Sequence, residues 1–260
     1  MKMIMHDRYC DEIEHQVGLL REVAAGADLS VTVPTCPDWS LDQLIRHTGG
    51  SLRWAELMVR TRTQEEIPEE QVPGYEGPQS ASDLDAWLAE SGETLVRTLR
   101  AAGPDAPVWS WGGIPEARFW ARRMTHELTI HRADATLAAG QPYEVAADIA
   151  ADALDEWLAT VEFLVQKQAP EDRELVGPGH RIHLHATDTP PGLNGDWIVE
   201  LTEDGVAWRH GREEATVALH GPLTSVLLAF YRRLPLDSAE LEVLGERKVL
   251  EFWLSEASFG

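Results

Sequence analysis

The sequence predicts an α+β protein, with a helical bundle over residues 1–170 and a small α/β domain over residues 171–260. Apolar residues recur at helical spacing through the first two thirds of the chain. After residue 179 they alternate at period two, as in "RIHLHATD", which is typical of half-buried strands. The stretch "QAPEDRELVGPG" lies between the two patterns, so the domain boundary is expected near residues 168–179.

Five helices are expected in the first part. The first covers residues 7–25, where apolar side chains share one face. Ser40 and Gln43 form a capping box that starts the second helix, and "EEIPEEQVPGYEGPQSAS" follows it as an exposed loop. Ser82 caps a third helix that ends near residue 102. Pro115 opens a fourth helix that Gly140 closes, and a fifth runs from about residue 145 to 167.

The second part reads as strands with two helices. "RIHLHATD", "DWIVELTEDGVAWRHG" and "ATVALHG" predict strands, and "TEDG" predicts a hairpin turn within the second of these stretches. "PLTSVLLAFYRRL" predicts a helix, "ELEVLG" a strand and "ERKVLEFWL" a terminal helix.

Composition and charge exclude several classes of protein. With 22 basic and 44 acidic residues, the net charge of −22 repels a phosphate backbone, so no nucleic-acid partner is expected. No apolar run approaches the ~18 residues of a membrane span, and no signal peptide is evident. Cys10 and Cys36 are the only cysteines, which favours the reducing cytoplasm over a disulfide framework.

The stretch "ARRMTHELTIHRADATLAAG" contains the chemistry-bearing residues of the fourth helix. "HELTIH" is one residue longer than the HExxH zinc signature, and Ile130 stands where the second histidine of that signature would be. Glu127 and His131, however, are four residues apart and share a helix face. His126 is five residues from His131 and points elsewhere, which favours a packed bundle histidine.

A third ligand is available on the second helix. His47 in "LIRHTGG" lies beside apolar residues, and the two glycines after it permit close approach of another segment. In a bundle, facing helices can supply ligands to one metal ion. Two imidazoles and a carboxylate suit zinc, but also nickel, iron or manganese. The alternative is an ordinary salt-bridged pair of Glu127 and His131 with no metal.

"VPTCPDWSLDQLIRHTGG" followed by "RRMTHELTIHRADA" resembles the mycothiol-dependent maleylpyruvate isomerase family. The resemblance implies a DinB-like up-and-down helical bundle. It continues through "GPLTSVLLAFYRRLPLDSAELEVLGERKVLEFWL", which is similar to the family's small α/β domain, itself like sterol-carrier modules. Carried across, His47, Glu127 and His131 are the zinc ligands, and Arg233 is the catalytic arginine of the tail domain. Arg232 remains an alternative for that role.

The family resemblance also implies a reaction. Mycothiol, a small sugar-linked cysteine thiol, would add as thiolate to the cis double bond of a small electrophile such as maleylpyruvate. Rotation and loss of the thiol would then give the trans isomer. Thiol transfer to another electrophile, a zinc-dependent hydrolase of the DinB-like superfamily and a non-catalytic small-ligand-binding protein are the alternatives.

Other residues near these motifs have two interpretations each. Trp39 either lines the thiol pocket or anchors the turn before the second helix. Arg123 either binds the cofactor or pairs with Glu127. Asp134 either orients a ligand or is solvated. Cys36 is explained by a tight turn as well as by reactivity.

A pair of histidines lies outside this constellation. His183 and His185 are two apart on an expected strand, hence on one face, and could chelate a metal. No acidic or cysteine partner is evident nearby in the sequence, so an exposed polar strand face is favoured.

Overall fold

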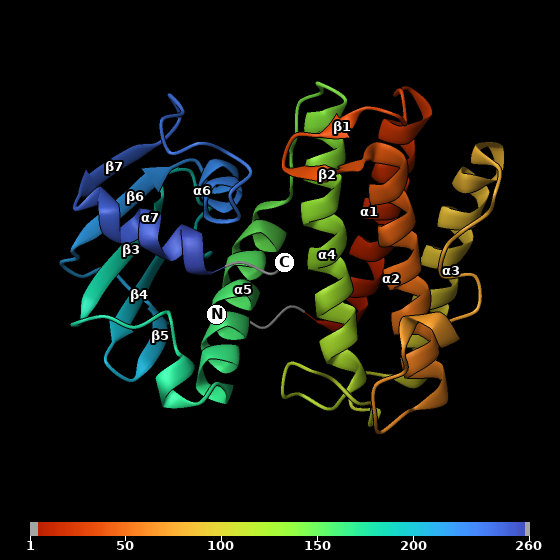
Figure 1. The fold of residues 1–260 in the computed structure, drawn as a ribbon, viewed down its shortest axis with the longest axis horizontal. Helices are drawn as coiled ribbons and strands as arrows, with labels where there is room; N and C mark the ends of the chain where they lie inside the picture. The colour runs from red at the N-terminus through yellow and green to blue at the C-terminus, as the bar shows by residue number, and fades with distance from the viewer. Residues whose placement is uncertain (1–4, 258–260) are drawn as a thin grey trace. The chain divides into compact units, whose positions relative to one another are not determined.

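The computed structural model describes residues 5–257, and these divide into two compact units, residues 5–143 and 144–257 (Figure 1). The first unit is helical and the second contains a sheet with helices, so the predicted α+β class is confirmed. Within residues 5–257, none of the helices has the length and apolar character needed to cross a membrane.

The first unit contains four long helices. They are α1 (His6–Ala25), α2 (Leu41–Thr61), α3 (Leu84–Ala102) and α4 (Ala117–Ala138). The expected capping box is present at the start of α2: Gln43 donates its backbone N–H to Ser40 Oγ at 3.3 Å, and its Oε1 accepts from the Ser40 N–H at 2.8 Å. Before α2, Pro34 and Pro37 would suit an irregular segment. The structure instead has a short antiparallel pair there, β1 (Thr32–Val33) and β2 (Cys36–Ser40).

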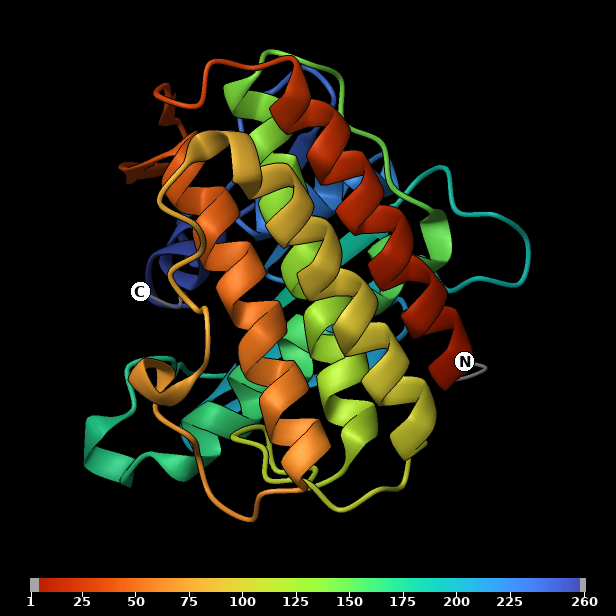
Figure 2. The same cartoon turned by 90° about the vertical axis from the view of Figure 1, so that its right-hand side faces the viewer.

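The four helices do not alternate in direction along the chain (Figure 2). α2 and α3 are parallel, because Arg53 bonds to Ser91 and Glu56 to Thr98 further along both helices. α2 and α4 are antiparallel, with His47 beside Glu127. The directions are therefore up, down, down and up, which differs from strict up-and-down order. The connection over residues 62–83 is long enough to return the chain to the starting end of α2.

Apolar faces of all four helices meet in one core. α1 lies beside α3 and α4, and α2 lies beside the same two helices. The largest fully buried side chains of this unit are those of Trp120, Ile13, Leu20, Leu41, Leu44, Ile45, Leu52, Met58 and Leu88. This core fixes α2 against α4, the two helices that carry the candidate ligands.

The second unit has a five-stranded mixed sheet in the order β5-β4-β3-β6-β7. The strands are β3 (His180–Ala186), β4 (Asp196–Thr202), β5 (Gly205–His210), β6 (Val217–Gly221) and β7 (Glu242–Gly245). β3 and β6 are parallel and every other pair is antiparallel. The helices are α5 (Ala147–Lys167), α6 (Leu223–Phe230) and α7 (Arg247–Glu256).

Helix α5 belongs to the second unit, where it packs against β5 and α6. Trp197 donates from its indole N–H to Asp155 Oδ1 at 2.6 Å, and Tyr231 donates its hydroxyl to the carbonyl of Ala153 at 3.2 Å. The chain therefore divides between Tyr143 and Glu144, ahead of the boundary that the composition indicated near residues 168–179. The helical period of α5 does not reveal which apolar surface it covers, so the sequence grouped it with the preceding helices.

The two faces of the sheet differ in character. Ile182, Leu184 and Trp197 are fully buried on the face that α5, α6 and α7 contact. The opposite face carries the alternate residues of the same strands, including His183 and His185. This second face is polar and partly open to solvent.

Candidate metal centre

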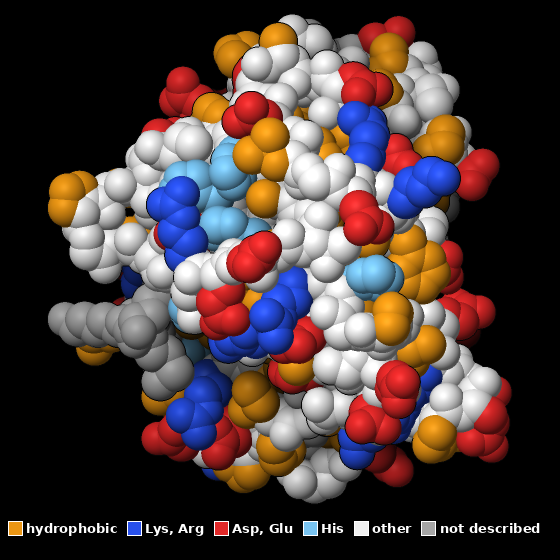
Figure 3. Space-filling model, turned by 90° about the vertical axis from the view of Figure 1, so that its left-hand side faces the viewer, with side chains coloured by type: hydrophobic (Ala, Val, Ile, Leu, Met, Phe, Trp, Pro, Cys, Tyr) orange, Lys and Arg blue, Asp and Glu red, His pale blue; other side chains and the backbone are white. Residues whose placement is uncertain are grey.

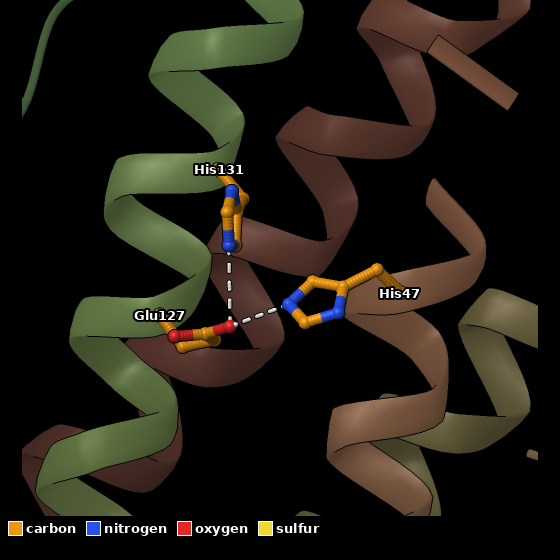
Figure 4. A group of neighbouring side chains, drawn as sticks. All are labelled: His47, Glu127 and His131. Atoms are coloured by element: carbon orange, nitrogen blue, oxygen red, sulfur yellow. Dashed lines mark hydrogen bonds and ion pairs between the residues drawn. The ribbon is translucent and has the colours of Figure 1, made fainter. Parts of the chain in front are cut away.

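His47, Glu127 and His131 converge between α2 and α4 (Figure 4). The Nε2 atoms of His47 and His131 lie 3.0 and 3.2 Å from Glu127 Oε1. One ligand atom from each residue lies within 4.8 Å of the other two. Their side chains are 31, 18 and 13% exposed, so the group is sheltered yet reachable from solvent.

Helix geometry explains the convergence. Glu127 and His131 are one turn apart on α4 and therefore point to the same side, as their spacing predicted. His47 faces them because α2 runs antiparallel beside α4, with Trp54 packed against Trp120 one to two turns further along. The residues around His47 made it a candidate third ligand, but the sequence could not place α2 against this face of α4; the family resemblance indicated that placement.

The two glycines after His47 admit close neighbours, as predicted, though neither neighbour is α4. A Cβ on Gly49 would lie 2.2 Å from the ring of Trp87 on α3. A Cβ on Gly50 would lie 2.9 Å from the carbonyl oxygen of Tyr75. Part of the connection expected to be merely exposed thus packs beside the centre. Tyr75 was missed by sequence reasoning, and the glycine pair was the only signal for it.

Asp134 orients the His131 ring through the ring nitrogen that faces away from Glu127. Its Oδ2 accepts a hydrogen bond from His131 Nδ1 at 3.0 Å, and its Oδ1 accepts one from the Thr35 hydroxyl at 2.5 Å. Cys36 Sγ donates to Oδ2 at 3.8 Å. The carboxylate of Asp134 is completely buried, so it orients a candidate ligand and is not solvated. Thr35, which no sequence motif indicated, is part of this support.

Arg123 and Trp39 border the three candidate ligands. Arg123 Nη2 donates to Glu127 Oε2 at 3.1 Å, which leaves Oε1 directed at the two imidazoles. The Trp39 ring lies 4.7 Å from the ring of His47 and 6.1 Å from that of His131. Trp39 is half-buried and packs against the core, so it anchors the turn and also covers one side of the site.

The pKa values of Glu127 and His131 depend on each other. Burial raises the pKa of Glu127, but the charge and hydrogen bond of His131, the hydrogen bond of His47 and the charge of Arg123 outweigh it, and the pKa lies well below its usual value. Burial lowers the pKa of His131, but the charge of Glu127 and the hydrogen bond to Asp134 outweigh it, and the pKa is raised. The Glu127 carboxylate is thus stabilised by the positive charge of His131 and Arg123. A bound metal cation would stabilise it in the same way.

The donor set fits zinc. In a tetrahedral site with bonds of about 2.0–2.1 Å, neighbouring donor atoms are about 3.3 Å apart. The distances of 3.0 and 3.2 Å to Glu127 Oε1 are close to that value. The ring centres of His47 and His131 are 5.0 Å apart, which allows both imidazoles to reach one ion. Three protein ligands with partial solvent access are typical of an open catalytic site and not of a closed structural one.

His126 and the two arginines are the remaining predicted residues, and each is described within its own unit. His126 is fully buried and packs edge-on against Tyr9 of α1, so it is not part of the cluster, as its helical phase indicated. Arg233 belongs to the second unit, where its Nη1 donates to the carbonyl of Tyr231 at 2.8 Å. Arg232 is exposed and has a left-handed backbone, with φ of 64°.

Comparison with known proteins tests the architecture that these residues define. The model of the mycothiol maleylpyruvate isomerase N-terminal domain matches residues 10–136, and the model of the carboxy-terminal domain of the same family matches residues 148–252. The protein thus belongs to the class in which a helical bundle with a candidate metal site precedes a small α+β domain. The chain belongs to the mycothiol maleylpyruvate isomerase family.

Solved structures agree with this membership. The crystal structure of the mycothiol-dependent maleylpyruvate isomerase is similar over 94% of this chain and 95% of that chain, with 15% identity and a TM-score of 0.60. A histidine-to-alanine mutant of that enzyme is similar over the same shares, with 16% identity and a TM-score of 0.58. At such identity the likeness establishes the fold alone. Comparison with curated proteins finds no significant match.

Proposed function

We propose that this protein is a metal-dependent enzyme that uses mycothiol as thiol cofactor or co-substrate. The proposed substrate is a small electrophile of the maleylpyruvate type. The enzyme would either isomerise it or transfer the thiol to it. The observation that carries the proposal is the convergence of His47, Glu127 and His131 in a chain that belongs to this family. Zinc or another divalent metal is the proposed ion.

A zinc ion held by two neutral imidazoles and one carboxylate would lower the pKa of an incoming thiol from about 8.5, so that thiolate is present at neutral pH. The protein's own residues prepare the site for this chemistry. Asp134 accepts the Nδ1 proton of His131, so that the Nε2 lone pair is directed at the ligand position. Arg123 holds Glu127 Oε2 and so keeps Oε1 in place.

Trp39 and Tyr75 provide the surroundings that a small organic thiol needs. The Trp39 ring covers the two imidazoles on one side, and the backbone of Tyr75 lies against Gly50, one turn along α2 from the centre. Trp39 and Arg123 are the residues we assign to the thiol cofactor: Trp39 as an apolar wall and Arg123 as a hydrogen-bond donor.

The proposed isomerisation is a cycle of addition and elimination. The thiolate sulfur bonds to one carbon of the cis double bond, and the electron pair moves to the conjugated carbonyl oxygen as an enolate. Rotation about the resulting single bond follows. The enolate then reforms the double bond in the trans geometry and expels the thiolate. We assign the guanidinium of Arg233 to the substrate carboxylate or to the enolate oxygen.

The proposal is tested by following the conversion of maleylpyruvate in four preparations: complete, without mycothiol, after chelation, and after zinc is restored. Turnover should require both the thiol and the metal, His131→Ala should remove it, and His15→Ala, on an exposed helix position, should not. Metal-dependent turnover that is indifferent to thiol would point to a hydrolase instead. Binding of ligand with no turnover would indicate a non-catalytic protein, and either result overturns the proposal.

A further inference from the structure

His183 and His185 have the acidic partner that the sequence did not reveal. Both donate to the same carboxylate oxygen: His183 Nε2 and His185 Nδ1 each lie 2.8 Å from Asp196 Oδ1. Asp196 stands directly opposite His185 in the register of β3 and β4. The face is polar, as expected, but the expectation that no acidic partner lies nearby is wrong, because the loop over residues 187–195 returns an aspartate to this position.

A third histidine adjoins the group from the other side. His220 of β6 is directly opposite His185, since β3 and β6 pair in parallel register. The His220 ring centre lies 5.1 Å from that of His185 and 5.8 Å from that of His183. Three neighbouring strands thus place an aspartate and three histidines on one face of the sheet.

The distances suit a shared ion. One ligand atom each of His183, His185 and Asp196 lies within 4.8 Å of the other two. Two imidazoles bound to one tetrahedral zinc place their ring centres about 5 Å apart, and the three ring separations here are 5.1, 5.8 and 5.9 Å. The two histidine–aspartate distances would widen by about 0.5 Å on metal binding, which small side-chain rotations supply.

The group is accessible yet firmly held. The side chains of His185 and Asp196 are 22 and 25% exposed, whereas that of His183 is 6% exposed. Figure 3 shows histidine side chains gathered at the surface of one face of the molecule, beside basic and acidic side chains. Strands hold ligands more rigidly than loops do, which reduces the conformational cost of binding.

We propose that His183, His185 and Asp196 form a second metal site, with His220 as fourth ligand, selective for zinc and related first-row transition metals. A set of imidazoles with a single carboxylate favours zinc, cobalt or nickel over calcium and magnesium, which require more oxygen ligands. Four protein ligands are typical of a structural zinc site. This site lies within one sheet and is independent of the proposed enzymatic function.

The test is a cobalt titration of the full-length protein, previously stripped of metal, followed by visible absorption and by calorimetry. The wild type should bind two equivalents. His47→Ala should retain one equivalent, which reports the sheet site regardless of what the bundle does. Asp196→Asn in the His47→Ala background should lose that equivalent or bind it at least ten-fold more weakly.

Two further variants guard against misfolding and chance binding. His220→Gln in the same background should weaken cobalt binding while leaving the sheet intact by circular dichroism, and His15→Gln should change nothing. If the His47→Ala protein binds no cobalt, or binds it equally with and without the Asp196 carboxylate, the proposed site is refuted.

Discussion

The Nδ1 atom of His131 lies 3.0 Å from Oδ2 of Asp134, one turn along α4, and the aspartate is completely buried. A carboxylate can only accept, so this contact places the proton on Nδ1 and directs Nε2 at Glu127 and His47. The Thr35 hydroxyl donates to the other oxygen of the same carboxylate. The candidate ligand is therefore oriented by Asp134 of α4, which is itself held by Thr35 in the turn between β1 and β2.

Asp134→Asn should weaken zinc binding to the bundle site about 10–100-fold. The amide can present an N–H toward His131 and so favour the wrong tautomer. Competition with a chromogenic chelator measures the affinity, and the Asp196→Asn background removes the second proposed site. Asp38→Asn, the same change at an exposed position of β2, is the control and should leave the affinity unaltered. Equal affinity in the Asp134 and Asp38 variants would show that the contact does not orient a ligand.

Metal should also stabilise the first unit. A ligand that binds only the folded state, at one hundred times its dissociation constant, stabilises by about 2.7 kcal/mol. In the Asp196→Asn background, zinc should raise Tm by several degrees, and a chelator should reverse the shift. His131→Ala should abolish the zinc-dependent shift, and His15→Ala should keep it. A shift that survives in the His131 variant would mean that zinc binds at other residues.

Replacing Arg233 and Arg232 by lysine, one at a time, shows which of the two binds the substrate. Lysine keeps the charge but loses the planar pair of donors that grips a carboxylate. If Arg233 binds substrate carboxylate or enolate, Arg233→Lys should lower kcat of the isomerase reaction by about 10²-fold or more. Arg232→Lys is the matched control and should be nearly neutral. The assignment is reversed if the loss follows Arg232.

Cys10 should be chemically inert in the folded protein. Burial raises the pKa of its thiol to about 11, and its side chain is fully buried in α1. The thiolate fraction at pH 8 is then roughly 10⁻³, against roughly a quarter for a free thiol with a pKa near 8.5. Iodoacetamide at pH 8 should therefore leave Cys10 unmodified, and reaction should appear only on raising the pH toward 11 or on unfolding.

Mass spectrometry of digested protein identifies the modified cysteine. Cys10→Ser should leave the course of alkylation at pH 8 unchanged, since the remaining thiol at Cys36 is only half-buried. Rapid modification of Cys10 at pH 8 in native protein would contradict its burial. The expected inertness also agrees with a reaction in which the sulfur nucleophile comes from an external thiol.

Much of the fold follows from local sequence signals. Helical spacing predicts all the long helices, alternation predicts β3 to β6, and the Ser40–Gln43 box marks the start of α2. Local signals do not show in which direction each helix or strand runs, or which other element it packs against. The parallel course of α2 and α3, and the packing of α5 on the sheet, depend on long-range burial that no short stretch encodes.

The same division applies to the sites. The Glu127–His131 pair is a property of one helix and is read from spacing alone. His47 was a candidate from its own apolar neighbours and the glycine pair, but it joins Glu127 and His131 only through the packing of two helices, and the family resemblance supported that link. Asp196 joins His183 and His185 through strand register. With a nine-residue loop between the strands, that register is not determined by a short turn, so the sequence left this cluster unrecognised.

Close packing beside His47 gives a final prediction. Gly49 lies on the buried side of α2, where an added Cβ would be 2.2 and 2.3 Å from two carbons of the Trp87 ring. Trp87 cannot swing away freely, because its indole N–H donates to the carbonyl of Gly74 at 3.1 Å. Alanine gains up to about 1 kcal/mol in helix propensity over glycine, but overpacking costs about 1–3 kcal/mol. The clash should prevail, so Gly49→Ala should lower the free energy of unfolding.

Gly18→Ala on α1 is the matched control, because nothing lies within 4 Å of its Cβ position. There only the propensity gain acts, and the variant should be more stable by up to about 1 kcal/mol. Chemical denaturation measures both. Since Gly49 is two residues from His47, its alanine variant should also weaken zinc binding to the bundle, whereas the Gly18 variant should not. Two variants of equal stability would mean that the Trp87 ring accommodates the methyl group and that the close approach is not a constraint on the site.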